Sequence, residues 1–171
     1  MRNASAGFIV VEGPIGVGKT TLAKKLANSL GYNIHLEEYK QNPFLESFYG
    51  DVEKYALGTQ LFFLLQRAKD FSKNRLNIYK NKIVSDFFIQ KDKIFAETIL
   101  NDKEFNLYLD ISNRLDIFIP CPDLVIYLQA EQESLHKRIK TRANHFEKKI
   151  SPEYLKKIND AYTSFFYSYK E

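Results

Sequence analysis

Cysteine, tryptophan and methionine are scarce in this 171-residue chain, which has one cysteine, one methionine and no tryptophan. The lone cysteine, Cys121, cannot form an internal disulfide, which excludes a scaffold held together by disulfides. Cys121 lies between two prolines in IPCPD. Because no base is apparent beside it, we interpret it as a structural loop residue rather than a nucleophile.

Long hydrophobic runs and dense runs of one charge are also missing. The apolar stretch in MRNASAGFIVVEG is too short for a signal peptide or a membrane span. The 25 basic and 21 acidic residues leave a formal charge of +4, a mild excess that an anionic small ligand can account for without nucleic acid. We therefore expect a cytoplasmic protein that has neither a membrane nor a nucleic acid as its partner.

Short apolar segments alternate with helical segments along the chain. The segments GFIVVEG, YNIHLEE, NKIVSDF and DLVIYLQA are predicted strands, and a long helix is predicted over about residues 51–79. Gly31 is an expected helix C-cap, and Ser151 followed by Pro152 is an expected helix start. This alternation predicts an α/β fold of three layers, in which a parallel sheet has helices on both faces. No repeat or linker divides the chain, so residues 1–171 are predicted to form one domain.

The segment GPIGVGKT, residues 13–20, matches the phosphate-binding pattern G-x-x-x-x-G-K-[ST] between a predicted strand and a predicted helix. Glycines let successive backbone N–H groups curl around phosphate oxygens, and the positive end of the following helix adds to the attraction. Lys19 would reach the β- and γ-phosphates, and the hydroxyl of Thr20 would bind Mg²⁺. The predicted ATP-binding residues are Gly13, Pro14, Ile15, Gly16, Val17, Gly18, Lys19, Thr20 and Thr21.

Asp86 follows the predicted strand KIVS, at the carboxyl edge of the sheet where ligands bind in open parallel sheets. Its carboxylate can orient the Mg²⁺ shell from the side opposite Thr20. A P-loop alone does not separate a kinase from a GTPase switch or a motor ATPase. The sequence contains no N-K-x-D element of the kind that reads guanine, which disfavours a GTPase.

Residues 60, 63, 64 and 67 share one face of the predicted long helix, so Gln60, Phe63 and Arg67 can project into a single cleft. A glutamine amide donates and accepts hydrogen bonds at once, which suits the paired donor and acceptor on the edge of a nucleobase.

Five ordered motifs, GPIGVGKT, LEEYKQNPFLESFYGD, TQLFFLLQRAKD, SDFFIQKDKIFA and PDLVIYLQA, resemble those of the deoxynucleoside kinase family. The similarity is greatest to its bacterial deoxyadenosine and deoxyguanosine kinases and spans about residues 8–166. It implies a homodimer of P-loop subunits, each with a short lid, that transfers the γ-phosphoryl group of ATP to the 5′-hydroxyl of a deoxynucleoside.

The resemblance implies roles for the residues that match these motifs. Glu37 in HLEEY matches the glutamate that accepts the 5′-hydroxyl proton, and Glu38 is the alternative. Tyr49 matches a tyrosine that hydrogen-bonds the sugar 3′-hydroxyl. Gln60 matches the base-reading glutamine, and Arg67 an arginine near the base and the 5′ end.

Further residues are expected around the base. Asp92 resembles an acid near the base that can pair with Arg67. Phe44, Phe63 and Phe95 are candidates to flank the base, although in a chain with 14 phenylalanines each is also a candidate for the core.

The lid is expected over about residues 138–150. Arg138 and Arg142 are one helical turn apart and would point the same way, to stabilise the charge on the transferring phosphoryl group. They match two lid arginines of the family, whereas Asn144 takes the place of a third, and Glu147 matches a glutamate that contacts the 3′-hydroxyl. Without the family, this basic stretch would be interpreted as an ordinary solvated helix face.

The chain departs from the family pattern in two places. Many members carry an arginine after the acid that matches Asp86, but this chain has Phe87, so we expect Arg67 and the lid to supply the positive charge there. Members usually continue past FFYSYKE into a fifth strand and a terminal helix. Either the sequence is shortened or the sheet has four strands with one edge uncovered.

The resulting hypothesis is a Mg²⁺-dependent kinase of nucleotide salvage in which Glu37, Lys19, Arg138 and Arg142 are catalytic. Purine deoxynucleosides, deoxyadenosine first, are the expected substrates. A nucleoside monophosphate kinase is an alternative, but it needs a second cluster of arginines for the acceptor phosphate. A nucleotide-binding switch with little transferase activity is another, although it gives no reason for the spacing of Tyr49 and the residues on the long helix.

Overall fold

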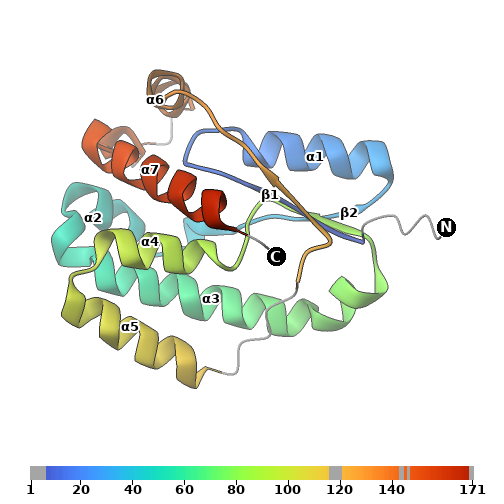
Figure 1. Cartoon of the computed structure of the whole chain (residues 1–171), viewed down its shortest axis with the longest axis horizontal. Helices are drawn as coiled ribbons and strands as arrows, with labels where there is room; N and C mark the ends of the chain where they lie inside the picture. The colour runs from blue at the N-terminus through green and yellow to red at the C-terminus, as the bar shows by residue number, and fades with distance from the viewer. Residues whose placement is uncertain (1–6, 116–120, 143–144, 146, 170–171) are drawn as a thin grey trace.

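Four parallel strands form the central sheet of the computed structural model, which describes residues 7–115, 121–142, 145 and 147–169 (Figure 1). The strands are β1 (Phe8–Glu12), β2 (Asn33–His35), β3 (Ile83–Ser85) and β4 (Leu124–Tyr127), in the order β2-β3-β1-β4. Val10 of β1 is in register with Ser85 of β3 on one side and Val125 of β4 on the other. All four predicted strands are confirmed.

The long helix and the two helix ends predicted from the sequence are also present in the structure. The long helix is α3 (Val52–Lys80), and α1 (Lys19–Leu30) ends at Gly31, whose φ of 68° is the left-handed conformation that glycine adopts without strain. The hydroxyl of Ser151 caps the last helix by accepting a hydrogen bond from Tyr154 N at 3.1 Å. The other helices are α2 (Leu45–Gly50), α4 (Lys91–Ile99), α5 (Asp102–Arg114), α6 (Gln132–Thr141) and α7 (Pro152–Ser168), with short 3₁₀ turns η1 (Tyr39–Gln41) and η2 (Glu147–Lys149).

Helices cover both faces of the sheet, so the predicted three-layer α/β fold is confirmed (Figure 1). On one face, Ala23 of α1 packs against Val11 and Val84 in a buried cluster. On the other face, Val10 packs in a second cluster with Phe71 of α3, and residues of α7 lie against this cluster. Because residues alternate between the faces of a strand, neighbouring residues of β1 serve different clusters.

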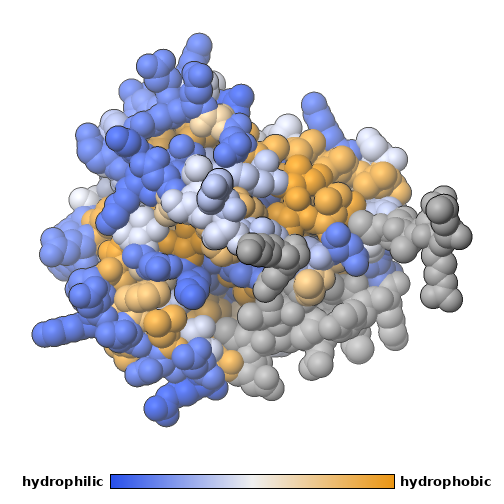
Figure 2. Space-filling model, in the orientation of Figure 1, coloured by the Kyte–Doolittle hydropathy of each residue, from blue (hydrophilic) through white to orange (hydrophobic). Residues whose placement is uncertain are grey.

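Two strands lie at the edges of the sheet among the described residues, β2 and β4. Leu124 of β4 is 46% exposed, and Figure 2 shows hydrophobic side chains gathered on the surface where β4 and α1 lie in Figure 1. Within the described part of the chain, the helices are too short or too polar to cross a bilayer.

The carboxyl ends of the parallel strands meet at one edge, and this arrangement positions the candidate site. The loop that follows β1 is the P-loop, the segment after β2 carries Glu37, and the segment after β3 carries Asp86. Three stretches that are far apart in the sequence therefore converge on the same place.

Candidate active site

A cavity of about 310 Å³ opens at this edge of the sheet. Its volume falls within the range usual for small-molecule sites. Its walls come from the P-loop, the segments after β2 and β3, and helices α2, α3, α4, α6 and α7. Among the lining residues are Gly16, Gly18, Lys19, Thr20, Thr21, Glu37, Tyr49, Gln60, Phe63, Arg67, Asp86, Asp92, Arg138, Arg142 and Glu147. Most of the predicted site residues are therefore brought together.

The P-loop has the backbone that its glycines permit. Gly16 and Gly18 have φ values of 83° and 108°, in a region that other residues rarely adopt. Lys19 Nζ donates to the carbonyl oxygens of Gly13 at 2.7 Å and Pro14 at 3.1 Å, which folds the lysine back over the loop. Burial, and after it the charge of Lys91, lowers the pKa of Lys19 to about 8.

Asp86 connects the P-loop with the segment after β2. Its Oδ2 accepts from the hydroxyl of Thr20 at 2.5 Å, and its Oδ1 accepts from the backbone N–H of Glu37 at 2.8 Å. Mg²⁺ takes oxygen ligands, usually one or two carboxylates with substrate phosphates and water, and in P-loop proteins also a Ser or Thr hydroxyl, so this pair of oxygen atoms fits the ion. The described residues contain no cluster of three His, Cys, Asp or Glu side chains that could hold a metal by themselves.

Glu37 lies between two cations. Its Oε1 pairs with the guanidinium of Arg67, and its Oε2 accepts from Lys91 Nζ at 2.6 Å. Burial opposes ionisation of Glu37, but Lys91 and Arg67 together outweigh it and hold the pKa of the carboxyl well below its ordinary value. The alternative, Glu38, is exposed and binds Gln41 instead, so only the first of the two glutamates faces the cavity.

The face of α3 predicted to line a cleft does so. Gln60 is 3% exposed and Arg67 is 5% exposed, and both border the cavity with Phe63. Arg67 forms the predicted ion pair with Asp92, and its guanidinium lies 4.8 Å from the centre of the Phe63 ring.

The phenylalanines predicted to flank the base divide into two groups. Phe63 and Phe95 line the cavity. Phe44 does not: its ring packs against Phe62 and beside Gly58, and the residue is 39% exposed. The structure therefore does not bring this candidate to the cavity, because Phe44 is the N-cap residue of α2 and its ring packs on α3 instead.

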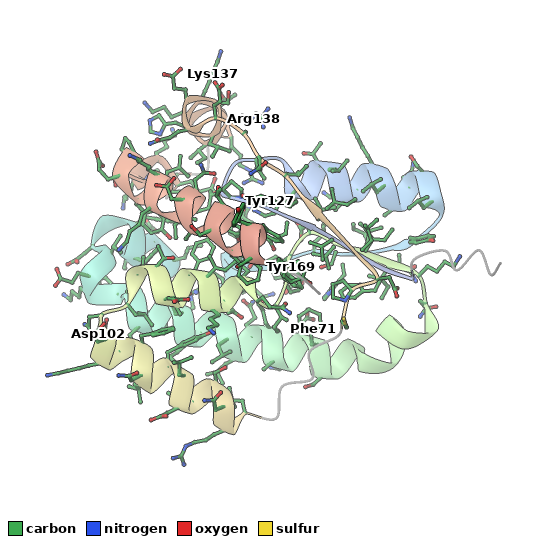
Figure 3. All side chains as sticks on the ribbon, in the orientation of Figure 1. Phe71, Asp102, Tyr127, Lys137, Arg138 and Tyr169 are labelled. Carbon is green, nitrogen blue, oxygen red and sulfur yellow. The ribbon has the colours of Figure 1, made fainter. Side chains whose placement is uncertain are left out.

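The lid arginines border the cavity from α6 and its end. Arg138 lies on the side of α6 toward the loop between β1 and α1, with Nη1 donating to Val17 O at 3.0 Å, whereas Lys137 projects outward (Figure 3). Arg142 Nη1 lies 3.7 Å from Oε1 of Glu147, which is buried. Asn144, the residue in the place of a third lid arginine, is outside the described residues.

Tyr49 of α2 enters the cavity near the lid. Burial first, and then the carboxylates of Glu147 and Glu37, raises the pKa of its phenol well above the ordinary value. The hydroxyl therefore stays protonated at neutral pH and can donate a hydrogen bond. Its ring centre lies 6.2 Å from that of Tyr154 on α7, which also lines the cavity.

Comparison with known proteins decides the family. The deoxynucleoside kinase family model matches residues 9–171. The chain belongs to the deoxynucleoside kinase family. It is 35% identical over 160 residues to a deoxyguanosine kinase of Bacillus subtilis, with 92% of this chain and 77% of the relative covered. It is also 35% identical over 170 residues to a deoxyadenosine kinase of Dictyostelium discoideum, with 96% and 68% covered.

Solved structures agree with this assignment. The fold of this deoxynucleoside kinase superposes on a deoxyadenosine kinase from M. mycoides with bound dATP, with a TM-score of 0.84 and 28% identity. The match covers 94% of this chain and 84% of the other. The chain is therefore a kinase with the P-loop fold of its family.

Two site residues of this kinase were missed by sequence reasoning. Lys91 is a buried cation beside Glu37, so the expectation that Arg67 and the lid alone supply positive charge was incomplete. Helical spacing places Lys91 and Phe95 on one face, but it does not distinguish Lys91 from Lys93 as the lysine that faces the site.

The second missed residue is Glu12, the last residue of β1, which is fully buried. Its carboxylate accepts hydrogen bonds from Gly13 N at 2.9 Å, Phe88 N at 2.8 Å and the hydroxyl of Tyr162 at 3.0 Å. Glu12 thus joins the start of the P-loop to the segment after β3 and to α7. A charged residue that closes an otherwise apolar strand directly before a P-loop was the available signal.

Proposed function

We propose that the chain transfers the γ-phosphoryl group of ATP to the 5′-hydroxyl of a purine deoxynucleoside, with deoxyadenosine preferred. The observation that carries the proposal is the position of Glu37, a carboxylate in the same cavity as the P-loop and the face of α3 with Gln60 and Arg67. A nucleoside between these walls would present its 5′-hydroxyl to the carboxylate and its base to Gln60. Proximity and orientation supply much of the rate in such transfers.

The proposed roles follow from charge and position. Lys19, Arg138 and Arg142 surround the phosphates with positive charge, where transfer spreads negative charge over the γ-phosphoryl oxygens. Glu37 accepts the proton of the 5′-hydroxyl, and Tyr49 and Glu147 bind the sugar. The backbone N–H groups of the P-loop bind the β- and γ-phosphates.

Thr20 and Asp86 are the residues we propose to hold Mg²⁺. When bound with ATP, the ion would neutralise phosphate charge. The short hydrogen bond between the two side chains shows that the oxygen atoms that would bind the ion already lie together, directly after Lys19 in the P-loop. The test is removal of divalent ions by EDTA, with turnover restored by added Mg²⁺.

Base preference rests on Gln60. On its N7 edge, adenine offers a neighbouring donor (the N6 amino group) and acceptor (N7) that a glutamine amide can match with two hydrogen bonds. On the same edge guanine offers two acceptors, O6 and N7, which an arginine matches best. Arg67, however, is already engaged by Glu37 and Asp92. The arrangement therefore favours deoxyadenosine over deoxyguanosine.

The deciding experiment is an ATP-coupled assay with deoxyadenosine, deoxyguanosine, deoxycytidine and thymidine, each as nucleoside and as 5′-monophosphate. We expect phosphorylation of nucleosides, with the highest kcat/KM for deoxyadenosine, and loss of that preference in Gln60→Leu. Transfer to monophosphates alone would indicate a monophosphate kinase, and no transfer at all would indicate a nucleotide-binding switch.

The proposal extends to a cytoplasmic homodimer, as the family resemblance implies. Sedimentation equilibrium of the purified chain tests the dimer directly. A mass near 20.0 kDa at micromolar concentration would contradict it.

A further inference from the structure

Lys91, the first residue of α4, contributes a buried ammonium group to the cavity wall. Its Nζ lies 2.6 Å from Glu37 Oε2 and 5.7 Å from the centre of the Phe95 ring, and its side chain is 11% exposed. Lys91 lines the same cavity as Glu37 and Lys19 of the P-loop.

The two cations on Glu37 are held differently. The guanidinium of Arg67 pairs with both Glu37 and Asp92 and lies over the Phe63 ring, so several contacts fix it in place. Lys91 carries its charge at the end of a flexible four-carbon chain. Of the two cations, Lys91 is the one that can leave Glu37 without breaking the contacts of Arg67 with Asp92 and Phe63.

The distances place Lys91 close to the reacting atoms. A base must lie within about 3.2 Å of the hydroxyl oxygen from which it takes a proton. A 5′-oxygen bound to Oε2 of Glu37 would thus lie within about 6 Å of Lys91 Nζ, and the phosphorus it attacks about 3 to 3.5 Å further on. To reach an oxygen on that phosphorus, the Lys91 side chain would have to change rotamer.

We propose that Lys91 is a catalytic residue whose ammonium moves from Glu37 to an oxygen of the transferring phosphoryl group when both substrates are bound. The proposal rests on the function proposed above. Glu37, released from Lys91, accepts the 5′-hydroxyl proton while the 5′-oxygen bonds to the γ-phosphorus. The bond from that phosphorus to the bridging oxygen breaks, and its electron pair leaves on ADP.

This role also accounts for the residue after Asp86. The family resemblance places an arginine there in many members, but Phe87 is 2% exposed and its ring packs against His35 and Phe71. The positive charge reaches the site from α4 instead, at Lys91.

The test compares Lys91→Met with Lys93→Met, a matched control from an exposed position on the same helix. Steady-state kinetics with deoxyadenosine and ATP give kcat and KM for each protein. We expect Lys91→Met to lower kcat by about a hundredfold while KM for either substrate changes less than about threefold, because the charge acts in the transition state. Lys93→Met should match the wild type.

In Lys91→Ala, added methylammonium should restore part of kcat, and tetramethylammonium, which has no N–H, should not.

If Lys91 only neutralised the charge of Glu37, kcat should change in the opposite direction. In the free chain, its removal would then leave a stronger base, and kcat would stay constant or rise. That result, or equal responses to the two ammonium ions, overturns the proposal. Should Lys91→Met not fold, Lys91→Gln keeps a hydrogen-bond donor without the charge and must show the same loss of kcat.

The two proposals fail in different ways. A wild-type chain that phosphorylates none of the deoxynucleosides contradicts the proposed function. An active wild type with an equally active Lys91→Met contradicts the role of Lys91 alone.

Discussion

Replacing Glu12 with glutamine should destabilise the fold more than any exposed charge change, because the carboxylate serves three donors at once. Oε1 accepts from Gly13 N and the Tyr162 hydroxyl, and Oε2 accepts from Phe88 N. A glutamine keeps one acceptor oxygen of the same shape. If that oxygen serves Gly13 and Tyr162, its amide nitrogen must face the N–H of Phe88, donor against donor.

The magnitude follows from these contacts. Losing one hydrogen bond to a charged group costs about 1.5 to 3 kcal/mol, and leaving a buried donor without a partner adds to this. Relief from burying a charge offsets part of the cost. We expect Glu12→Gln to lower the free energy of unfolding by about 2 to 3 kcal/mol, and Tyr162→Phe, which removes one hydrogen bond to the carboxylate and leaves no donor unpaired, by about 1.5 kcal/mol.

Urea denaturation followed by circular dichroism, without nucleotide, measures both changes. The exposed Glu97 of α4 provides a control, since Glu97→Gln removes the same charge from the surface and should stay within about 0.5 kcal/mol of the wild type. A loss in Glu12→Gln no larger than that in Tyr162→Phe would refute the reasoning. The double variant should lose less than the sum of the two, because the residues share a hydrogen bond.

Three further outcomes test the site. A Cβ on Gly16 would lie 2.8 Å from an isoleucine side chain of α6, whereas one on Gly18 meets nothing within 4 Å, although both have positive φ. Gly16→Ala should therefore lower the free energy of unfolding by about 1 kcal/mol more than Gly18→Ala in urea denaturation, and equal losses would contradict the packing argument. Burial first, and a neighbouring lysine second, lowers the pKa of Lys19 to about 8 from 10.5, so the unfolded state binds more protons between these values and stability without nucleotide should rise with pH there. The slope, at most about 1.4 kcal/mol per pH unit, should be weaker in Lys19→Met between about pH 8 and 9.5, and identical slopes would count against the shift. Asp86→Asn should raise the Mg²⁺ concentration for half-maximal turnover by about tenfold, and an unchanged Mg²⁺ titration would remove Asp86 from the metal site.

The sequence predicted the strands and the P-loop well because each depends on local pattern. Apolar runs bounded by turns and glycines mark β1 to β4, and Gly31 and Ser151 mark helix ends through their own backbone and hydroxyl chemistry. The face of α3 with Gln60 and Arg67 follows from helical spacing in the same way.

Lys91 and Phe44 show where this reasoning ends. Lys91 and Lys93 are equivalent in the string QKDKIFA, and only the packing of α4 against the site turns the first inward and leaves the second exposed. Phe44 has the right residue type near the right motif, but the orientation of a turn is set by its tertiary contacts. Which charged or aromatic side chain faces a cavity depends on how elements dock, and the spacing of one element does not contain that information.

The hydrogen bond between Glu12 and Tyr162 also bears on how the protein is made. The two residues are 150 positions apart, so the P-loop is synthesised well before the helix that carries Tyr162. Contacts of such long range form late and slow folding. A nascent chain that stops short of α7 would lack this contact to the P-loop, so ATP binding should report when α7 docks.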